Sequence, residues 1–417
     1  MLTDSQAVTS KGIDTHLILI YVALVIIGWL SIYSSSYDPQ AEFTLFNLDQ
    51  NYGRQLIWII VSAAFAIAIL VVEGKFFYNN AYIIYLIFML LILSVLFLGT
   101  EISGAKAWIK IGSFSIQPIE FAKFATALAL AKFFNEGKTD SERRNIWLIA
   151  FIFILVPAGI AILQKDTGSA LVFFSLIIMF YREGFSGWLM LLGLLIIVTF
   201  VFTLMWNELY TIAFLLVLLC ISCFFIRGNK MKLLRNVGIF LGFVMLVFAV
   251  NVAYTKVLQP HQRQRIDTIF GKSIDPKGAD FNLNQSKIAI GSGGFAGKGY
   301  LNGTQTKLNF VPEQTTDFIF CGIGEEWGFI GSIAIFTLFM ALILRIIFLA
   351  ERHKSTFVRV YGYGVASIIF FHLVINIGMT IGLVPVIGIP LPFISYGGSS
   401  LWGFTLLLFI FIKINAE

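Results

Sequence analysis

Long apolar runs recur along the whole chain, and short polar segments separate them. Each run is close to the ~20 residues that an α-helix needs to cross the hydrocarbon core of a bilayer. The pattern predicts about twelve spans, over residues 17–36, 55–72, 81–98, 118–134, 146–163, 168–181, 187–205, 208–226, 236–255, 318–348, 358–384 and 398–414. We therefore expect an all-α polytopic membrane protein with a single membrane domain over residues 1–417.

Composition agrees with this class and excludes others. Hydrophobic residues make up 58% of the 417 and charged residues 12%, with mean hydropathy +0.87, which is too little charge for a soluble surface. The net charge of +6 does not indicate a nucleic-acid partner, because the basic residues lie in short loops between spans. The polar start, residues 1–16, lacks the basic region of a signal peptide, so we expect the first span to remain as an anchor.

Basic residues predict the sidedness of the spans. Placing both termini in the cytoplasm puts most of the basic loop residues inside: Lys75, Lys138, Arg143, Arg144, Arg182, Arg227, Lys230, Lys232, Arg235, Arg352, Lys354, Arg359 and Lys413. The short outer loops then carry only Arg54, Lys106, Lys110 and Lys165, and positive-inside bias favours this orientation. Residues 255–316 become a large extracytoplasmic loop before the last three spans, and Asp317 lies outside with it.

Asp317 is the most conspicuous candidate for chemistry. It follows the polar segment 308–316 and begins a long apolar run, so its carboxylate lies at the mouth of a span. Charge is costly at that depth unless it is paired or used, which makes such a residue a functional candidate.

Three further charged side chains are expected at the outer ends of spans. Glu120 and Lys123 lie three residues apart on one helix face after Pro118, which suits a first helical turn. They form either a local ion pair or part of a functional site. Asp166 precedes the sixth span and is either its N-cap or a second carboxylate facing the same cavity.

The outer loop holds two basic features. Arg263 and Arg265 place guanidinium groups that suit either a diphosphate or anionic lipid. The glycine-rich string over residues 291–299 resembles a nucleotide-binding P-loop but fails the pattern, with Ser292 at the first glycine position and Gly299 after Lys298. Its glycines instead permit sharp turns and close backbone approach.

Other polar residues carry weaker signals. Residues 388–400 form a broken outer segment before the last span, and non-helical backbone at that depth must line a cavity or be covered by protein. His372 and Asn376 share a helix face, where helix-to-helix hydrogen bonding is favoured over substrate contact. One of Glu325 and Glu326 is expected to pair with a basic group. Cys220 and Cys223 have C-x-x-C spacing but no second pair, which favours packing over a metal site.

Seven strings in this chain resemble the SEDS family (shape, elongation, division and sporulation), in the family's order and over nearly the whole length. They occupy residues 117–123, 166–170, 285–293, 303–306, 316–320, 324–326 and 395–400. Residues 303–306, Gly-Thr-Gln-Thr, resemble the elongation members of the family more than the division members.

The resemblance implies a peptidoglycan glycosyltransferase for cell elongation and rod shape. Such an enzyme polymerises lipid II at the outer face of the bacterial cytoplasmic membrane and works with a class B penicillin-binding protein, a transpeptidase, and other elongation-complex membrane proteins. By the same match Asp317 is the essential carboxylate, and Glu120, Lys123 and Asp166 are cavity residues. We assign further substrate contacts to Arg263, Arg265, Trp108, Gln285, Ser286, Lys298, Ser395, Gly397, Gly398 and Ser399.

Two departures from the family pattern stand out. Thr315 replaces the histidine usual before the Thr-Asp pair, which puts in doubt any mechanism that uses that histidine. The family has about ten spans, and the surplus here points to a two-helix insertion within residues 187–255, which hold none of the strings.

The expected reaction is an inverting displacement of undecaprenyl diphosphate with Asp317 as base, which needs cations near the leaving group. Lys123, Arg263 and Arg265 are candidates for that contact. A divalent cation, Mg²⁺ or Mn²⁺, could accompany the diphosphate, although the sequence shows no dedicated metal site. Two rival functions are a lipid II flippase without chemistry and a non-enzymatic scaffold. A flippase would want polar residues through the whole membrane thickness, whereas the charges here cluster at the outer ends of the spans.

Overall fold

A computed structural model describes residues 12–417, apart from 38–45, 103, 113, 138–142, 207, 226–229, 258–278, 308–309 and 312. The chain divides into two compact units: Met1–Glu183 with Asn282–Glu417, called the main unit here, and Gly184–Phe281, called the second unit. All seven family strings lie in the main unit. Arg263 and Arg265 lie outside the described residues, so their roles stay predictions.

The described part of the chain is mostly helical, as the apolar pattern predicts. The main unit contains α1 (Thr15–Ser35), α2 (Asn51–Val71), α3 (Gly74–Leu98), α4 (Ile119–Asn135), α5 (Arg143–Leu163), α6 (Thr167–Ser175), α7 (Ile177–Arg182), most of α12 (Ala279–Gly293), α13 (Thr304–Lys307), α14 (Ile319–Arg352), α15 (Thr356–Thr380) and α16 (Gly398–Ala416). Among the described residues, nine helices are long and apolar enough to cross a membrane. Each of the twelve predicted ranges lies mostly on helix. However, α4, the α6–α7 pair and α9 are not among the nine helices long and apolar enough to cross a membrane, so the count of twelve spans stays a prediction.

The core of the main unit lies along α4, α15 and α16. α16 packs against α2, α4 and α15, and α14 packs against α1 and α15. Alanines on α4 let its neighbours approach closely, and α16 is buried on nearly every side. Tyr361 on α15 is fully buried, and its hydroxyl donates to the carbonyl of Leu407 on α16. These contacts form the scaffold on which the starts of α4 and α16 are held.

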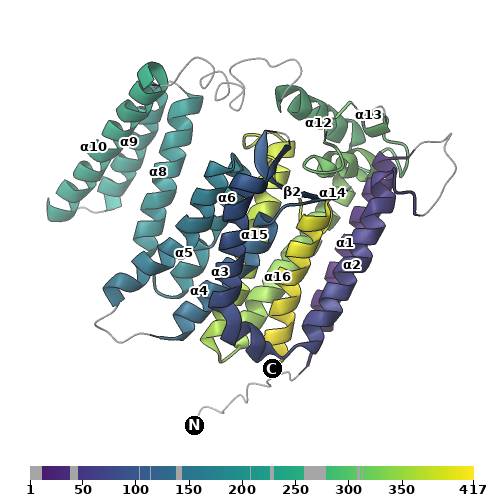
Figure 1. The fold of residues 1–417 in the computed structure, drawn as a ribbon. Helices are drawn as coiled ribbons and strands as arrows, with labels where there is room; N and C mark the ends of the chain where they lie inside the picture. Colours follow the sequence, from purple (N-terminus) through teal and green to yellow (C-terminus); the bar gives the residue numbers. More distant parts are fainter. Residues whose placement is uncertain are drawn as a thin grey trace, which may run out of the picture. The chain divides into compact units, whose positions relative to one another are not determined.

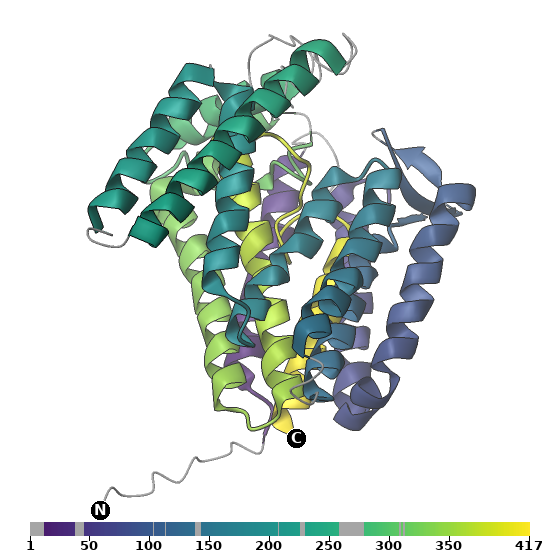
Figure 2. The ribbon, with the colours of Figure 1, turned by 90° about the vertical axis from the view of Figure 1, so that its left-hand side faces the viewer.

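A small antiparallel sheet follows α3, and the apolar pattern did not predict this sheet. Strands β1 (Thr100–Ile102), β2 (Ala105–Ile111) and β3 (Phe114–Ile116) pair in the order β1-β2-β3. Ile109 pairs with Ile116, and Gly104 and Gly112 take positive φ beside the turns. Within the main unit, Figures 1 and 2 show this sheet, α12 and α13 at the end opposite the C-terminus.

α14 is broken at Gly328, which has φ 63° and ψ −154°. A break frees backbone groups that the helix would otherwise pair. The glycine-rich loop after α12 pairs them: the N–H groups of Lys298 and Gly299 donate to the carbonyls of Glu325 and Glu326, each at 3.0 Å. The N–H of Phe329 in turn donates to the carbonyl of Gly294 at 3.0 Å.

The second unit is a separate helical group. It contains α8 (Gly187–Met205), α9 (Glu208–Phe225), α10 (Lys230–Val252) and a π-helical turn, η2 (Ala253–Val257). Leu215, Phe243 and Val247 form its buried core. The predicted insertion within residues 187–255 falls in this unit and stays a prediction.

Candidate functional site

Asp317 lies directly before α14, and hydrogen bonds hold its backbone from two sides. Asn376 on α15 donates from Nδ2 to the carbonyl of Asp317 at 2.8 Å and to the carbonyl of Ile389 at 2.7 Å. The Ser395 hydroxyl donates to the carbonyl of Thr316 at 2.7 Å. The segment before α14 is therefore fastened to α15 and to the irregular chain before α16.

The Asp317 carboxyl, in contrast, makes no hydrogen bond or ion pair with any residue that the structure describes. It is half-buried, and its Oδ2 would lie 3.2 Å from a Cβ placed on Gly388, so a glycine there leaves room beside it. Burial, together with the nearby carboxylates of Glu313 and Asp166, raises the pKa of Asp317 to about 7. A carboxylate with that pKa can exchange a proton near neutral pH.

Glu120 and Lys123 form the predicted ion pair, with Lys123 Nζ 2.7 Å from Glu120 Oε1. Both side chains are buried, at 4% and 3% exposure. Removing one partner of a buried pair leaves an uncompensated charge, so this pair has a larger effect on stability than a surface pair. Lys123 Nζ also lies 3.1 Å from His372 Nε2, while His372 Nδ1 lies 3.0 Å from the carbonyl of Pro390. A carbonyl only accepts, so Nδ1 carries the proton and Nε2 accepts from the ammonium group.

Asp166 fulfils both of the roles considered for it. As the N-cap of α6 it accepts from the Ser169 N–H at 2.9 Å and from the Ser169 hydroxyl at 2.9 Å. Its Oδ2 also accepts from Gln117 Nε2 at 2.8 Å, which links the start of α6 to the start of α4. The Gln117 N–H donates to the Ser399 hydroxyl at 2.9 Å, which links α4 to the start of α16.

These links hold the starts of α4, α6 and α16 together, and the starts of α4 and α6 line one small cavity. Asp317 is not one of the lining residues but lies beside Gly388, which is one of them. The cavity has a volume of about 40 Å³ and is lined by Gln117, Glu120, Lys123, Asp166, Ser169, Val172, His372, Gly388, Ile389 and Pro390. Glu120 Oε2 is buried and has no hydrogen-bond partner among the described residues. Helix N-termini carry partial positive charge and unpaired N–H groups, so the arrangement favours an anionic ligand at its rim.

Four predicted substrate-binding residues lie at the start of α16 or directly before it, and each makes a structural contact. Ser395 and Ser399 make the hydrogen bonds described above, and the N–H of Gly397 donates to Gln55 Oε1 at 3.2 Å. Gly398 allows close packing, since a Cβ there would lie 2.9 Å from the Trp58 ring. Their contact with substrate stays a prediction.

The remaining predicted contacts lie elsewhere. Trp108 lies on β2 and is not among the cavity-lining residues. Gln285 and Ser286 lie on α12, where the buried Ser286 hydroxyl donates to the carbonyl of Thr380 at 3.0 Å. Lys298 Nζ pairs with Glu325 Oε1 at 2.6 Å, so the structure does not bring Lys298 to the cavity. That pair confirms that one of the two neighbouring glutamates on α14 has a basic partner.

His372 makes the predicted helix-to-helix hydrogen bond, with Lys123 on α4, and also lines the cavity, whereas Asn376 donates to backbone carbonyls outside the helices. Gln117 and Ser169 lie within the family strings and were not assigned a role. Polar residues at the start of an apolar run were the available signal for both. Thr315, at the position of the usual histidine, accepts from Asn51 Nδ2 at 3.4 Å and offers no titratable group.

Comparison with known proteins places this geometry in a family. The family model for FtsW, RodA and SpoVE, described as cell cycle protein, matches residues 14–214 and 186–417. Peptidoglycan glycosyltransferase RodA of Treponema pallidum is 30% identical, covering 97% of this chain and 98% of that protein. Peptidoglycan glycosyltransferase MrdB of Escherichia coli K12 is 31% identical, covering 93% and 90%.

Two solved structures have the same fold. One belongs to a peptidoglycan synthase complex that coordinates polymerization and crosslinking, with TM-score 0.70, 26% identity and coverage of 97% of this chain and 98% of that chain. The other is the rod shape determining protein RodA of Thermus thermophilus, with TM-score 0.59, 24% identity and 97% coverage of both chains. This helical, multi-pass membrane chain therefore belongs to the FtsW/RodA/SpoVE family of cell cycle proteins.

Proposed function

We propose that this chain is a peptidoglycan glycosyltransferase that polymerises lipid II into glycan strands for cell elongation. Relatives that cover nearly the whole chain carry the name peptidoglycan glycosyltransferase. The observation that carries the proposal is Asp317, whose carboxylate has no partner among the described residues and has a raised pKa, beside a cavity lined by the starts of α4 and α6. A base next to an anion-favouring rim is what glycosyl transfer from a diphosphate requires.

In the proposed reaction, Asp317 takes the proton from the acceptor sugar hydroxyl as its oxygen attacks the anomeric carbon of the donor. The bond from that carbon to the diphosphate oxygen breaks, and undecaprenyl diphosphate leaves with the electron pair. A single displacement inverts the anomeric centre and needs no covalent enzyme intermediate. Glu120 and Asp166 both have hydrogen-bonded partners, so Asp317 is the carboxylate best placed to act as the base.

The leaving diphosphate needs positive charge. The N-terminal ends of α4 and α6 supply partial positive charge, and Lys123 lines the cavity with one N–H beyond its two partners. Arg263 and Arg265 remain proposed contacts. We also propose that Mg²⁺ or Mn²⁺ could enter with the diphosphate as part of the substrate. Among the described residues, no group of three His, Cys, Asp or Glu side chains is arranged to hold a metal ion.

The proposed location is the bacterial cytoplasmic membrane, with the cavity facing the periplasm or exterior. The proposed partners are a class B penicillin-binding protein and other membrane proteins of the elongation complex. The solved relative in a complex that coordinates polymerization and crosslinking supports a transpeptidase partner.

Purified protein in vesicles with lipid II tests the proposal. Wild type should form glycan chains, whereas Asp317→Asn should form none and keep its thermal stability and its partner binding. Asn is nearly isosteric with Asp and cannot accept the proton. Full polymerisation by Asp317→Asn would refute the assignment of the base. If wild type moves lipid II across the bilayer but forms no glycan chains, the flippase is favoured. If it does neither and still binds its partner, a scaffold is favoured.

A further inference from the structure

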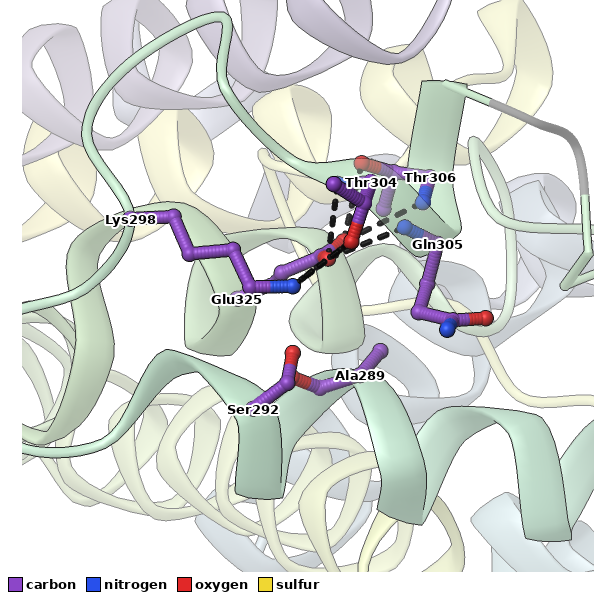
Figure 3. A network of polar contacts seen from close by, with 7 residues as sticks. All are labelled: Ala289, Ser292, Lys298, Thr304, Gln305, Thr306 and Glu325. Atoms are coloured by element: carbon purple, nitrogen blue, oxygen red, sulfur yellow. Dashed lines mark hydrogen bonds and ion pairs between the residues drawn. The ribbon is translucent and has the colours of Figure 1, made fainter.

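A second buried polar network surrounds Glu325 on α14, away from the cavity (Figure 3). The Glu325 side chain is fully buried, and both of its oxygens accept hydrogen bonds. Oε1 accepts from Lys298 Nζ at 2.6 Å and from the N–H groups of Thr304 and Gln305 at 2.8 and 2.9 Å. Oε2 accepts from the N–H and the hydroxyl of Thr306, both at 3.1 Å.

Glu325 thus caps the N-terminus of α13, although it lies about 20 residues further along the chain. The first N–H groups of a helix have no partner within the helix, and a carboxylate at that end satisfies them and matches their partial charge. Gly303 makes this approach possible, since a Cβ there would lie 2.2 Å from Thr306 Oγ1 and 3.0 Å from Glu325 Oε2. The two family strings at 303–306 and 324–326 therefore meet in one assembly.

The network closes a loop that contains Asp317. The chain runs from α13 through Asp317 into α14, and two turns into α14 Glu325 reaches back to the start of α13. Inside this loop Val311 is buried against Phe318, and Gln314 Nε2 donates to the carbonyl of Ser35 on α1 at 3.3 Å. The loop is thus held at its base by Glu325.

The base of the loop is itself anchored. Lys298 is fixed twice, by its side chain on Glu325 and by its N–H, which donates to the Glu325 carbonyl at 3.0 Å. Gly297 approaches the same turn so closely that a Cβ there would lie 2.1 Å from the Glu326 carbonyl oxygen. A rigid attachment of this kind transmits the position of α14 to the loop.

We propose that Glu325 is a positioning residue for glycosyl transfer, because it holds the base of the loop that presents Asp317 to the cavity. This inference rests on the proposed function of Asp317. It predicts that loosening the base displaces Asp317 without removing any group that touches the substrate. A displacement of about 1 Å can reduce a rate about 100-fold.

The test compares Glu325→Gln with wild type in lipid II polymerisation. Gln keeps one acceptor oxygen, but its NH₂ group would face the N–H donors that now bind the second carboxylate oxygen. We therefore expect kcat to fall at least about tenfold, while KM for lipid II stays within about threefold. The acidic limb of the pH profile should also move to lower pH, because a loosened loop admits water to Asp317 and relieves the burial that raises its pKa. The matched control is Glu351→Gln, which removes a carboxylate from the other end of α14, where it pairs with Arg182 at 2.5 Å, and should leave kcat unchanged.

Lys298→Met is a second variant that removes one donor and introduces no opposing group. It should lower kcat less and move the pH limb in the same direction, so the inference stays testable if Glu325→Gln does not fold. Wild-type kcat in both variants, or a loss of thermal stability with an unmoved pH limb, would refute positioning. Asp317→Asn is measured alongside: activity in that variant would refute the proposed function itself, whereas its inactivity with a normal Glu325→Gln would refute only this inference.

Discussion

At the scale of single residues, the three acidic side chains expected at the site differ in their partners. Glu120 is bound by Lys123, and Asp166 caps α6 and accepts from Gln117, so both carboxylates have hydrogen-bond donors as partners. Asp317 has neither a donor nor a counter-ion among the described residues. The difference supports the proposal that the first two carboxylates have structural roles and that Asp317 transfers the proton.

The raised pKa of Asp317 makes a prediction about pH. The carboxyl acts as a base only when charged, and its pKa is raised from 3.8 to about 7, so the active form is lost as pH falls below about 7. We expect kcat/KM to rise with pH up to about 7 and then to level off, measured as initial rates of lipid II polymerisation at subsaturating substrate.

Glu313→Gln should move that midpoint to lower pH, because it removes a neighbouring negative charge that raises the Asp317 pKa. The control is Glu101→Gln, which alters an exposed carboxylate on β1 and should leave the midpoint in place. An unchanged midpoint in Glu313→Gln would show that another group governs the acidic limb.

The positions of the site residues could be predicted from the sequence, but their partners could not. Asp317, Glu120 and Asp166 each lie where a polar segment meets an apolar run, which is a local signal. His372, the second partner of Lys123, lies 249 residues further along the chain. Only the packing of α15 against α4 brings the two together, and one sequence contains no local pattern for that packing.

At the scale of elements, the glycine-rich loop is explained by the broken helix. The string 291–299 fails the P-loop pattern, and the structure uses its backbone to pair the groups freed at Gly328. Apolar periodicity predicted one long run over residues 318–348 but not its break, because the break depends on the backbone of another segment.

Two glycines on α12 provide a matched test of this docking. A Cβ on Gly293 would lie 2.0 Å from the Gly324 carbonyl oxygen, whereas Gly291 has open space within 4 Å. Gly293→Ala should lower the thermal stability clearly, by about 2 kcal/mol or more, because backbone atoms on α14 must move apart. Gly291→Ala should be neutral or stabilising by up to about 1 kcal/mol, since Ala favours helix.

Thermal unfolding in detergent, followed by circular dichroism, would measure both variants. Equal stability of the two would contradict a close backbone contact between α12 and α14. Polymerase activity of Gly293→Ala gives a second reading, because displacement of this part of α14 also displaces Glu325.

At the scale of the whole molecule, the main unit separates its charges between two ends. The sheet and α13 lie at one end, and the cavity is lined by the start of α4, which directly follows β3 of that sheet. The other end holds the C-terminus, where the Gly74 N–H donates to the Glu417 carboxylate and Arg359 pairs with Glu183 at 3.1 Å. Within the main unit, Lys75, which follows Gly74, and Arg359 are two of the basic residues expected in the cytoplasm, and both lie at this end, as the alternation of spans predicts from sequence.

This separation predicts which end faces outward, and cysteine labelling in intact cells can test it. In a background where Cys220, Cys223 and Cys321 are replaced by Ser, Glu101→Cys introduces a thiol on the exposed β1 strand, and Lys75→Cys introduces one at the exposed start of α3. A membrane-impermeant maleimide should label Glu101→Cys in intact cells and Lys75→Cys only after permeabilisation, because positive-inside bias places Lys75 in the cytoplasm. The reverse pattern would put the cavity in the cytoplasm, where a lipid-linked donor displayed on the outer leaflet could not reach Asp317. The labelling pattern expected here therefore supports both the proposed orientation and the proposed polymerase activity, and the reverse pattern contradicts both.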